Sequence, residues 1–173
     1  MEYEPIKFEF TEEERRLAAD EGYRRHRVDM EIGAKPRDGA PEEEKESIKL
    51  DLYGAAGEMA VASYLGLKKF LYEEVTPRRG SYDLPPNIDV KAAMQHRFNL
   101  ILKVEDNPDF IYVLVTFQNK ECIIHGWIEG KMGKKEYNYT EGITRRPSYI
   151  VQKGLLRPMV ELKEIIESLN LGN

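Results

Sequence analysis

The segment spanning residues 110–117 constrains the fold most strongly, because it is apolar on both faces of a predicted strand. Side chains alternate between the two faces of a strand. Here one face would carry Ile111, Val113 and Val115, and the other would carry Tyr112, Leu114 and Thr116. A strand with two apolar faces is typical of the interior of a sheet that is covered on both sides. The chain is therefore expected to build a sheet around this segment.

Strand and helix patterns occupy most of the remaining chain. Short strand-like runs lie at residues 70–75, 81–84, 87–93, 98–104, 121–128 and 149–151. Thr11 and Glu14 have the spacing of a capping box, which predicts a helix over residues 11–32. Apolar side chains recur every three or four residues over residues 47–66 and 158–169, which predicts two more helices. Helices combined with a sheet indicate the α/β class.

The length and composition are those of one globular domain. With 173 residues, of which 41% are hydrophobic and 33% are charged, the chain can bury a substantial core. We expect a single domain over residues 1–173. It would have an N-terminal helix at about 11–32, a core at about 47–128, and a C-terminal strand and helix at about 149–170.

The sequence favours a cytoplasmic protein without a membrane partner. No apolar stretch approaches the roughly 20 residues that a membrane span needs. The first ten residues lack the basic start and apolar core of a signal peptide. Cys122 is the only cysteine, so it cannot form an internal disulfide, and a reducing compartment is the simplest expectation. Cys122 itself is expected to be a small core residue.

The triplet Asp89-Val90-Lys91 places an acid and a lysine on one face of the strand predicted at residues 87–93. Ile88, Val90 and Ala92 form the opposite, apolar face. The same pattern of acid, any residue and lysine also occurs at residues 43–45, 129–131 and 161–163. Those copies fall in an acidic loop-like run, at a strand end and in a helix pattern. The alternating strand distinguishes the copy at Asp89, although an exposed ion pair would give the same pattern.

Two further acids accompany this triplet. Asp83 lies just upstream across a turn that contains two prolines, and Glu58 lies beside the apolar stripe of the helix predicted at residues 47–66. A carboxylate at the border of a buried face costs free energy unless something pairs with it. Gly54 and Gly57 in the same helix indicate close packing or access to a site. Because carboxylate oxygens suit Mg²⁺ or Mn²⁺, three acids and one lysine could hold a metal ion and steer a water.

These four residues resemble the motif of the PD-(D/E)XK nuclease superfamily, in which a helix Glu precedes an Asp, and a D/E-x-K triplet follows on the next strand. The resemblance covers about residues 54–128 and matches Glu58, Asp83, Asp89 and Lys91, although no proline directly precedes Asp83. It implies a restriction-endonuclease-like core, with a central mixed β-sheet flanked by helices. The segments at residues 109–115, 126–128 and 147–158 also look similar to small nucleases encoded by phages and prophages.

The resemblance implies a nuclease that hydrolyses phosphodiester bonds of DNA with Mg²⁺ or Mn²⁺. Asp83 and Asp89 would coordinate the ion, joined by the Val90 carbonyl and by Glu58, either directly or through water. Lys91 would orient the attacking water and stabilise the charge that develops on phosphorus. The substrate stays open between duplex, single-stranded and branched DNA, with RNA as a further candidate. A homodimer would favour paired cuts, and a monomer would favour nicking or end processing.

Basic residues are clustered, although the net charge of the chain is −5. Arg78-Arg79 and His96-Arg97 bracket the acidic segment and are the expected phosphate contacts, with Gln95 also expected near the substrate. Other basic groups lie at residues 24–27, 68–69, 131–135 and 145–146. Runs of charge are also common on ordinary solvated surface, so each cluster has that second interpretation.

Other functions fit the same residues. A nucleic-acid-binding module could keep the nuclease fold without catalysis, and a phage assembly protein could use the sheet for contacts with partners. His26, His96 and His125 are too scattered in the sequence to indicate a zinc site. No Gly-rich phosphate loop follows a predicted strand, so nucleotide hydrolysis has no support.

Overall fold

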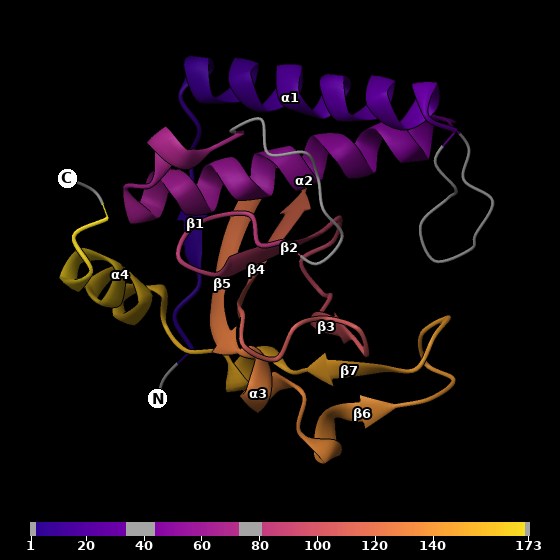
Figure 1. The fold of residues 1–173 in the computed structure, drawn as a ribbon, viewed down its shortest axis with the longest axis vertical. Helices are drawn as coiled ribbons and strands as arrows, with labels where there is room; N and C mark the ends of the chain where they lie inside the picture. Colours follow the sequence, from indigo (N-terminus) through magenta and orange to yellow (C-terminus); the bar gives the residue numbers. More distant parts are fainter. Residues whose placement is uncertain (1–2, 34–43, 73–80, 172–173) are drawn as a thin grey trace.

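The structure is a computed structural model that describes residues 3–33, 44–72 and 81–171 (Figure 1). The helices are α1 (Glu12–Glu31), α2 (Glu44–Leu65), α3 (Gly130–Gly133) and α4 (Met159–Ser168). The strands are β1 (Ile6–Phe8), β2 (Ile88–Ala93), β3 (Leu100–Lys103), β4 (Ile111–Gln118), β5 (Glu121–Glu129), β6 (Tyr139–Thr140) and β7 (Ser148–Val151). Within these ranges, short 3₁₀ helices lie at Lys68–Phe70 (η2), Glu136–Asn138 (η3) and Lys153–Leu155 (η4).

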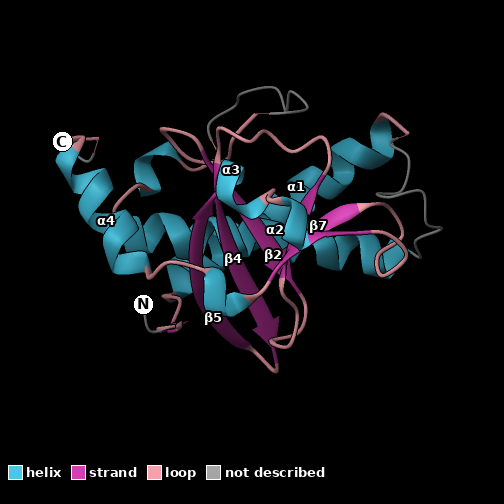
Figure 2. Ribbon diagram, turned by 90° about the horizontal axis from the view of Figure 1, so that it is seen from below, coloured by secondary structure: helices cyan, strands magenta, loops and turns pink. Residues whose placement is uncertain are grey.

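The strands form two sheets. The larger sheet has the order β1-β5-β4-β2, in which β2 runs parallel to β4 and the other neighbours are antiparallel. Figure 2 shows β5, β4 and β2 side by side. The smaller sheet is antiparallel, in the order β3-β7-β6. The fold is therefore mixed α/β, and the prediction that residues 110–117 lie inside a sheet is confirmed, because β4 has a neighbour on each side.

The two faces of β4 contribute to two separate apolar clusters. Val113 and Val115 pack with residues of α2 and α4, such as Val61 and Leu162, in the larger cluster. Tyr112 and Leu114 point to the other face and pack with residues of the smaller sheet, which include Leu102 and Val151. Because side chains alternate along β4, this strand packs against the helices with one face and against the smaller sheet with the other.

Helices α1 and α2 are stacked over the larger sheet (Figure 1). Helix α1 begins at Thr11 with the predicted capping box, in which the Thr11 backbone N–H donates to Glu14 and the Glu14 N–H donates to the Thr11 hydroxyl, at 2.9 and 3.1 Å. The buried Glu14 also accepts from the Ser63 hydroxyl of α2, at 2.7 Å. Figure 1 shows α1 outermost, with α2 between α1 and the sheet. Within the described ranges, no helix combines the length and apolar character that crossing a membrane requires.

Helix α2 lies close against β2 because Gly57 has no side chain. A Cβ at this position would stand 3.3 Å from the Cβ of Ala92 and 3.5 Å from a methyl group of Val90. This contact confirms that Gly57 permits close packing. The other helical glycine, Gly54, has nothing within 4 Å of where its Cβ would be, so the same explanation does not apply to it.

Several predicted boundaries were wrong. Residues 68–70 form η2 and residues 71–72 a turn where a strand over 70–75 was predicted, while residues 73–75 lie outside the described ranges. The strand predicted at 81–84 is reduced to one bridge, Leu84 to Ile88, because the prolines turn the chain back at once. Helix α2 begins at Glu44, three residues before the predicted start and within the run read as a loop. Strands β1 and β6 were not predicted.

Candidate functional site

Asp89 and Lys91 lie on β2, which is at one edge of the larger sheet. Val90 packs with the larger apolar cluster beside α2, so Asp89 and Lys91 point to the opposite face. The Lys91 Nζ lies 3.2 Å from Asp89 Oδ1 and 3.3 Å from Asp106 Oδ2, and 5.3 Å from the centre of the Tyr112 ring. The ion pair that was weighed as an alternative is therefore present, but it is mostly buried rather than exposed, because the side chains of Asp89 and Lys91 are only 18% and 27% exposed.

Asp83 lies along the free edge of β2. Its Oδ2 accepts a hydrogen bond from the Val90 backbone N–H at 2.7 Å, and its own backbone N–H donates to the Ile88 carbonyl. In an extended strand the N–H and C=O of one residue point to the same side. The Val90 carbonyl therefore also points away from β4, toward the side where Asp83 lies.

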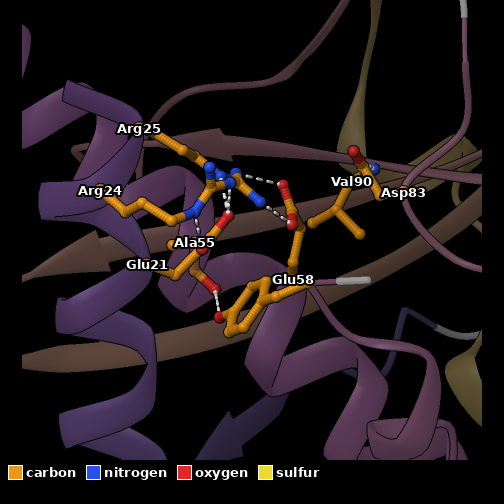
Figure 3. A network of polar contacts seen from close by, with 8 residues as sticks. Glu21, Arg24, Arg25, Ala55, Glu58, Asp83 and Val90 are labelled. Atoms are coloured by element: carbon orange, nitrogen blue, oxygen red, sulfur yellow. Dashed lines mark hydrogen bonds and ion pairs between the residues drawn. The ribbon is translucent and has the colours of Figure 1, made fainter. Parts of the chain in front are cut away.

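Glu58 reaches the site from α2 and is held by Arg25 of α1. Both Glu58 carboxylate oxygens accept from the Arg25 guanidinium, at 2.8 and 2.7 Å. Arg25 also donates to Glu21 at 2.9 Å, and its guanidinium lies 5.6 Å from the centre of the Tyr72 ring. Figure 3 shows Arg25 between Glu21 and Glu58, with Asp83 and Val90 on the far side of Glu58. Bidentate pairing of this kind fixes both position and orientation of a carboxylate.

Burial and neighbouring acids act on the carboxyl groups of Asp83 and Asp89. Burial raises the pKa of Asp83 well above its usual range, and the negative charges of Glu58 and Asp89 raise it further. Burial also raises the pKa of Asp89, with Lys91 opposing this effect and Asp106 and Glu58 adding to it. The three carboxylates are thus close enough for like-charge repulsion to act around one strand.

Lys91 is kept in its charged form. Burial alone would lower its pKa, but the adjacent carboxylates of Asp89 and Asp106 outweigh this effect and raise it. The Asp106 carboxylate is itself fixed, because its Oδ2 accepts from the Lys103 backbone N–H at 2.8 Å. The lysine is therefore a protonated donor between two acids.

The side chains of this cluster that could coordinate a metal are carboxylates. Carboxylate oxygens are ligands that suit a hard divalent cation. Among the residues that the structure describes, no three His, Cys, Asp or Glu side chains form a group that could hold a metal ion. Glu58 instead has Arg25 on both oxygens. Direct coordination of a metal by Glu58 would need its carboxylate to exchange at least one of these hydrogen bonds.

The residues after β2 that were expected to contact the substrate lie apart from the acidic residues of the site. His96 bonds through Nδ1 to the Thr116 hydroxyl at 2.7 Å, and Gln95 accepts from Arg97 at 2.5 Å. Thr116 lies four residues further along β4 than Tyr112, the partner of Asp89, or about 13 Å along the strand. Arg78 and Arg79, the other expected phosphate contacts, lie outside the described residues.

Two of the three histidines lie close together in space, although they are far apart in the sequence. Thr116 lies between them, because its hydroxyl also bonds His125 Nε2 at 2.5 Å. His125 is buried, and its Nδ1 bonds the Tyr3 hydroxyl. His26 lies elsewhere, 3.5 Å from Asp51 between α1 and α2. Sequence distance concealed the His96–His125 pair, because β4 and β5 place Thr116 and His125 side by side.

Arg25 and Asp106 are the site residues that sequence reasoning missed. Arg25 belongs to the basic run at residues 24–27, but nothing local indicates that it faces a glutamate 33 positions later. Asp106 precedes the turn at Asn107-Pro108, where an acid is common in any loop. By contrast, Cys122 is buried as predicted, and burial raises the pKa of its thiol to about 12.

Comparison with known proteins adds no name to this arrangement, since no family model, curated protein or solved structure matches the chain.

Proposed function

We propose that this protein is a divalent-metal-dependent nuclease that hydrolyses phosphodiester bonds of DNA, on a restriction-endonuclease-like core of the PD-(D/E)XK type. The main support is the cluster of acids around β2, where burial and neighbouring carboxylates, among them Glu58, raise the pKa of Asp83 and Asp89, with Lys91 two residues from Asp89. Clustered like charges with shifted pKa values are typical of functional sites. The mixed sheet with helices over one face agrees with such a core.

A divalent cation would relieve the repulsion among the acids. Asp83 and Asp89 would hold Mg²⁺ or Mn²⁺ with the Val90 carbonyl, and Glu58 would bind directly or through water after release from Arg25. When bound, such an ion screens the phosphodiester charge and lowers the pKa of a bound water. Arg25, once released, would stay close to the site as a second positive group near the phosphate.

Lys91 would act as a hydrogen-bond donor rather than as a base. Asp89 and Asp106 raise its pKa, so it carries its proton at neutral pH. A fixed positive charge beside the reacting phosphate would orient the attacking water and stabilise the charge that develops on phosphorus. Asp106 would serve as a positioning residue, because its carboxylate contacts Nζ in addition to that of Asp89.

The test is a cleavage assay on plasmid, linear, single-stranded and branched DNA, and on RNA, with Mg²⁺, Mn²⁺ or EDTA. We expect cleavage that EDTA abolishes and that Asp89→Ala or Lys91→Ala removes without loss of folding. Glu161→Ala and Lys163→Ala are matched controls, because they belong to a copy of the same pattern on α4 and should leave cleavage unchanged. Full cleavage by Asp89→Ala or Lys91→Ala would refute the assignment.

A second function, nucleic-acid binding without catalysis, has its own support. Arg25 already pairs with both oxygens of Glu58, and the Asp83 carboxylate already accepts from Val90. These contacts would be sufficient if the acids only stabilised the fold. A binding module would show salt-sensitive affinity for DNA in the same assay series and no metal-dependent product.

A further inference from the structure

Residues 130–151, which contain α3, η3 and the β6–β7 hairpin, form a basic segment on an acidic protein. We call this segment the basic arm. It carries five Lys or Arg residues and two Glu, for a net charge of +3, whereas the whole chain has a net charge of −5. Figures 1 and 2 show β7 and its loop at the periphery of the molecule. The rest of the chain is therefore more acidic than the total suggests, and the basic arm is a peripheral element with a local net positive charge.

The tip of the basic arm presents an apolar side chain beside two arginines. Ile143 is 75% exposed, the largest exposure among the large hydrophobic residues that the structure describes. Arg145 and Arg146 are exposed two and three positions later. The turn is fixed by Thr144, whose hydroxyl donates to the Arg146 carbonyl and bonds the Ser148 hydroxyl at 2.6 Å. This arrangement displays Ile143 to solvent from an ordered turn.

The base of the basic arm is bonded to the loop that positions Lys91. The Lys134 Nζ donates to the Val104 and Asp106 carbonyls, at 2.7 and 2.6 Å. The Asp106 side chain in turn contacts Lys91 Nζ. Pairing of β3 with β7 brings Lys103 opposite Ser148, so the start of this loop runs beside the arm. A partner bound along the arm would therefore pass close to the proposed catalytic residues.

We propose that the basic arm is a duplex-DNA-binding element, in which Arg145 and Arg146 contact phosphates and Ile143 makes an apolar contact in the minor groove. The proposal rests on the proposed function for its location beside the site. Its chemistry is independent of that function, because arginines neutralise phosphates and release counterions. Exposed aliphatic side chains beside arginine are the means by which minor-groove proteins contact base steps. Arg146 would exchange its distant partner Glu105, 3.9 Å away, for a phosphate.

The experiment measures binding of a fluorescent DNA duplex by anisotropy in EDTA, so that no metal-dependent cleavage occurs. The variants are Arg145→Ser/Arg146→Ser and Ile143→Ser. The control is Lys7→Ser/Lys120→Ser, which removes the same charge from β1 and the β4–β5 turn. Thermal unfolding checks that each variant folds. The double arginine variant should bind more weakly, and its slope of log K against log salt should be smaller by about 1.8.

The outcomes separate this inference from the proposed function. Equal affinity and equal salt slope for the arginine variant and the control would overturn the role of the arm, while metal-dependent cleavage could still stand. Arm-dependent binding in EDTA, together with no cleavage in the separate assay with Mg²⁺ or Mn²⁺, would support the arm and refute catalysis. An Ile143→Ser variant that binds as well as wild type would overturn the groove contact. Arm-dependent binding to phosphatidylserine vesicles, with none to DNA, would overturn the choice of partner.

Discussion

His125 should make the stability of the protein fall as the pH is lowered below about 6.5. The imidazole is buried at 3% exposure, between the Thr116 hydroxyl and the Tyr3 hydroxyl. Burial lowers its pKa to about 4, and the positive groups Lys153 and His96 add to this effect. The folded protein therefore keeps His125 neutral at a pH where the imidazole of an unfolded chain, with a pKa near 6.5, takes up a proton.

The direction and size of the effect follow from proton linkage. Above about pH 6.5 neither state binds the extra proton, so His125 has no pH-dependent effect there. As the pH falls, only the unfolded state gains the proton, and the free energy of unfolding decreases. The loss reaches about 2 kcal/mol at about pH 5 and approaches roughly 3 kcal/mol near pH 4, where the folded state begins to protonate too.

Urea unfolding of wild type and His125→Gln over this pH range isolates the effect. Glutamine can still bond the Thr116 hydroxyl but does not titrate. Asp83 and Asp89, whose raised pKa values favour the folded state as the pH falls, contribute equally to both proteins and cancel in the difference. We expect the stability of wild type relative to His125→Gln to decrease by about 2 kcal/mol between pH 7.5 and 5. A difference that does not change with pH would refute the reasoning.

Three other substitutions test separate parts of the fold and site. Thr11→Ala removes the side-chain half of the α1 capping box and should cost about 1 kcal/mol in urea unfolding, so an unchanged midpoint would contradict the role of the cap. Gly126→Ala would place a Cβ 2.5 Å from the Arg157 carbonyl oxygen at a residue with φ +138°, and should lower stability by roughly 3 kcal/mol in thermal or urea unfolding. Asp106→Asn should lower the pKa of Lys91 and reduce cleavage on the order of tenfold. A rate equal to that of the exposed-site control Asp109→Asn would exclude the positioning role.

The elements that were predicted correctly are marked by patterns in their own residues. The start of α1 is marked by Thr11 and Glu14, and the interior position of β4 by apolar residues on both faces. The short strands β1 and β6, of three and two residues, exist because β5 and β7 offer a pairing edge, so a local pattern cannot reveal them. Proline chemistry explains the failure at residues 81–84, where the turn leaves room for a single bridge.

The site residues fall into the same two groups, those with a local sequence signal and those whose contacts depend on tertiary packing. The pair Asp89 and Lys91 follows from strand alternation, which holds whatever the rest of the chain does. The contacts of Glu58 with Arg25, and of Lys91 with Asp106, depend on how α1 packs on α2 and where the loop after β3 ends. The partner of a long polar side chain depends on tertiary packing. The sequence contains many arginines and aspartates that a local pattern cannot tell apart. Local patterns thus indicate a site but leave its electrostatic partners undetermined.

The contact between Asp83 and Val90 also bears on how the protein behaves at high concentration. Strand β2 ends the larger sheet, and such an edge offers unpaired backbone groups to strands of other molecules. At Val90 the N–H is already taken by a carboxylate from the same chain. A foreign strand that added to this edge would have to displace Asp83 and lie beside the acidic cluster. The residue proposed to bind metal therefore also hinders intermolecular strand addition.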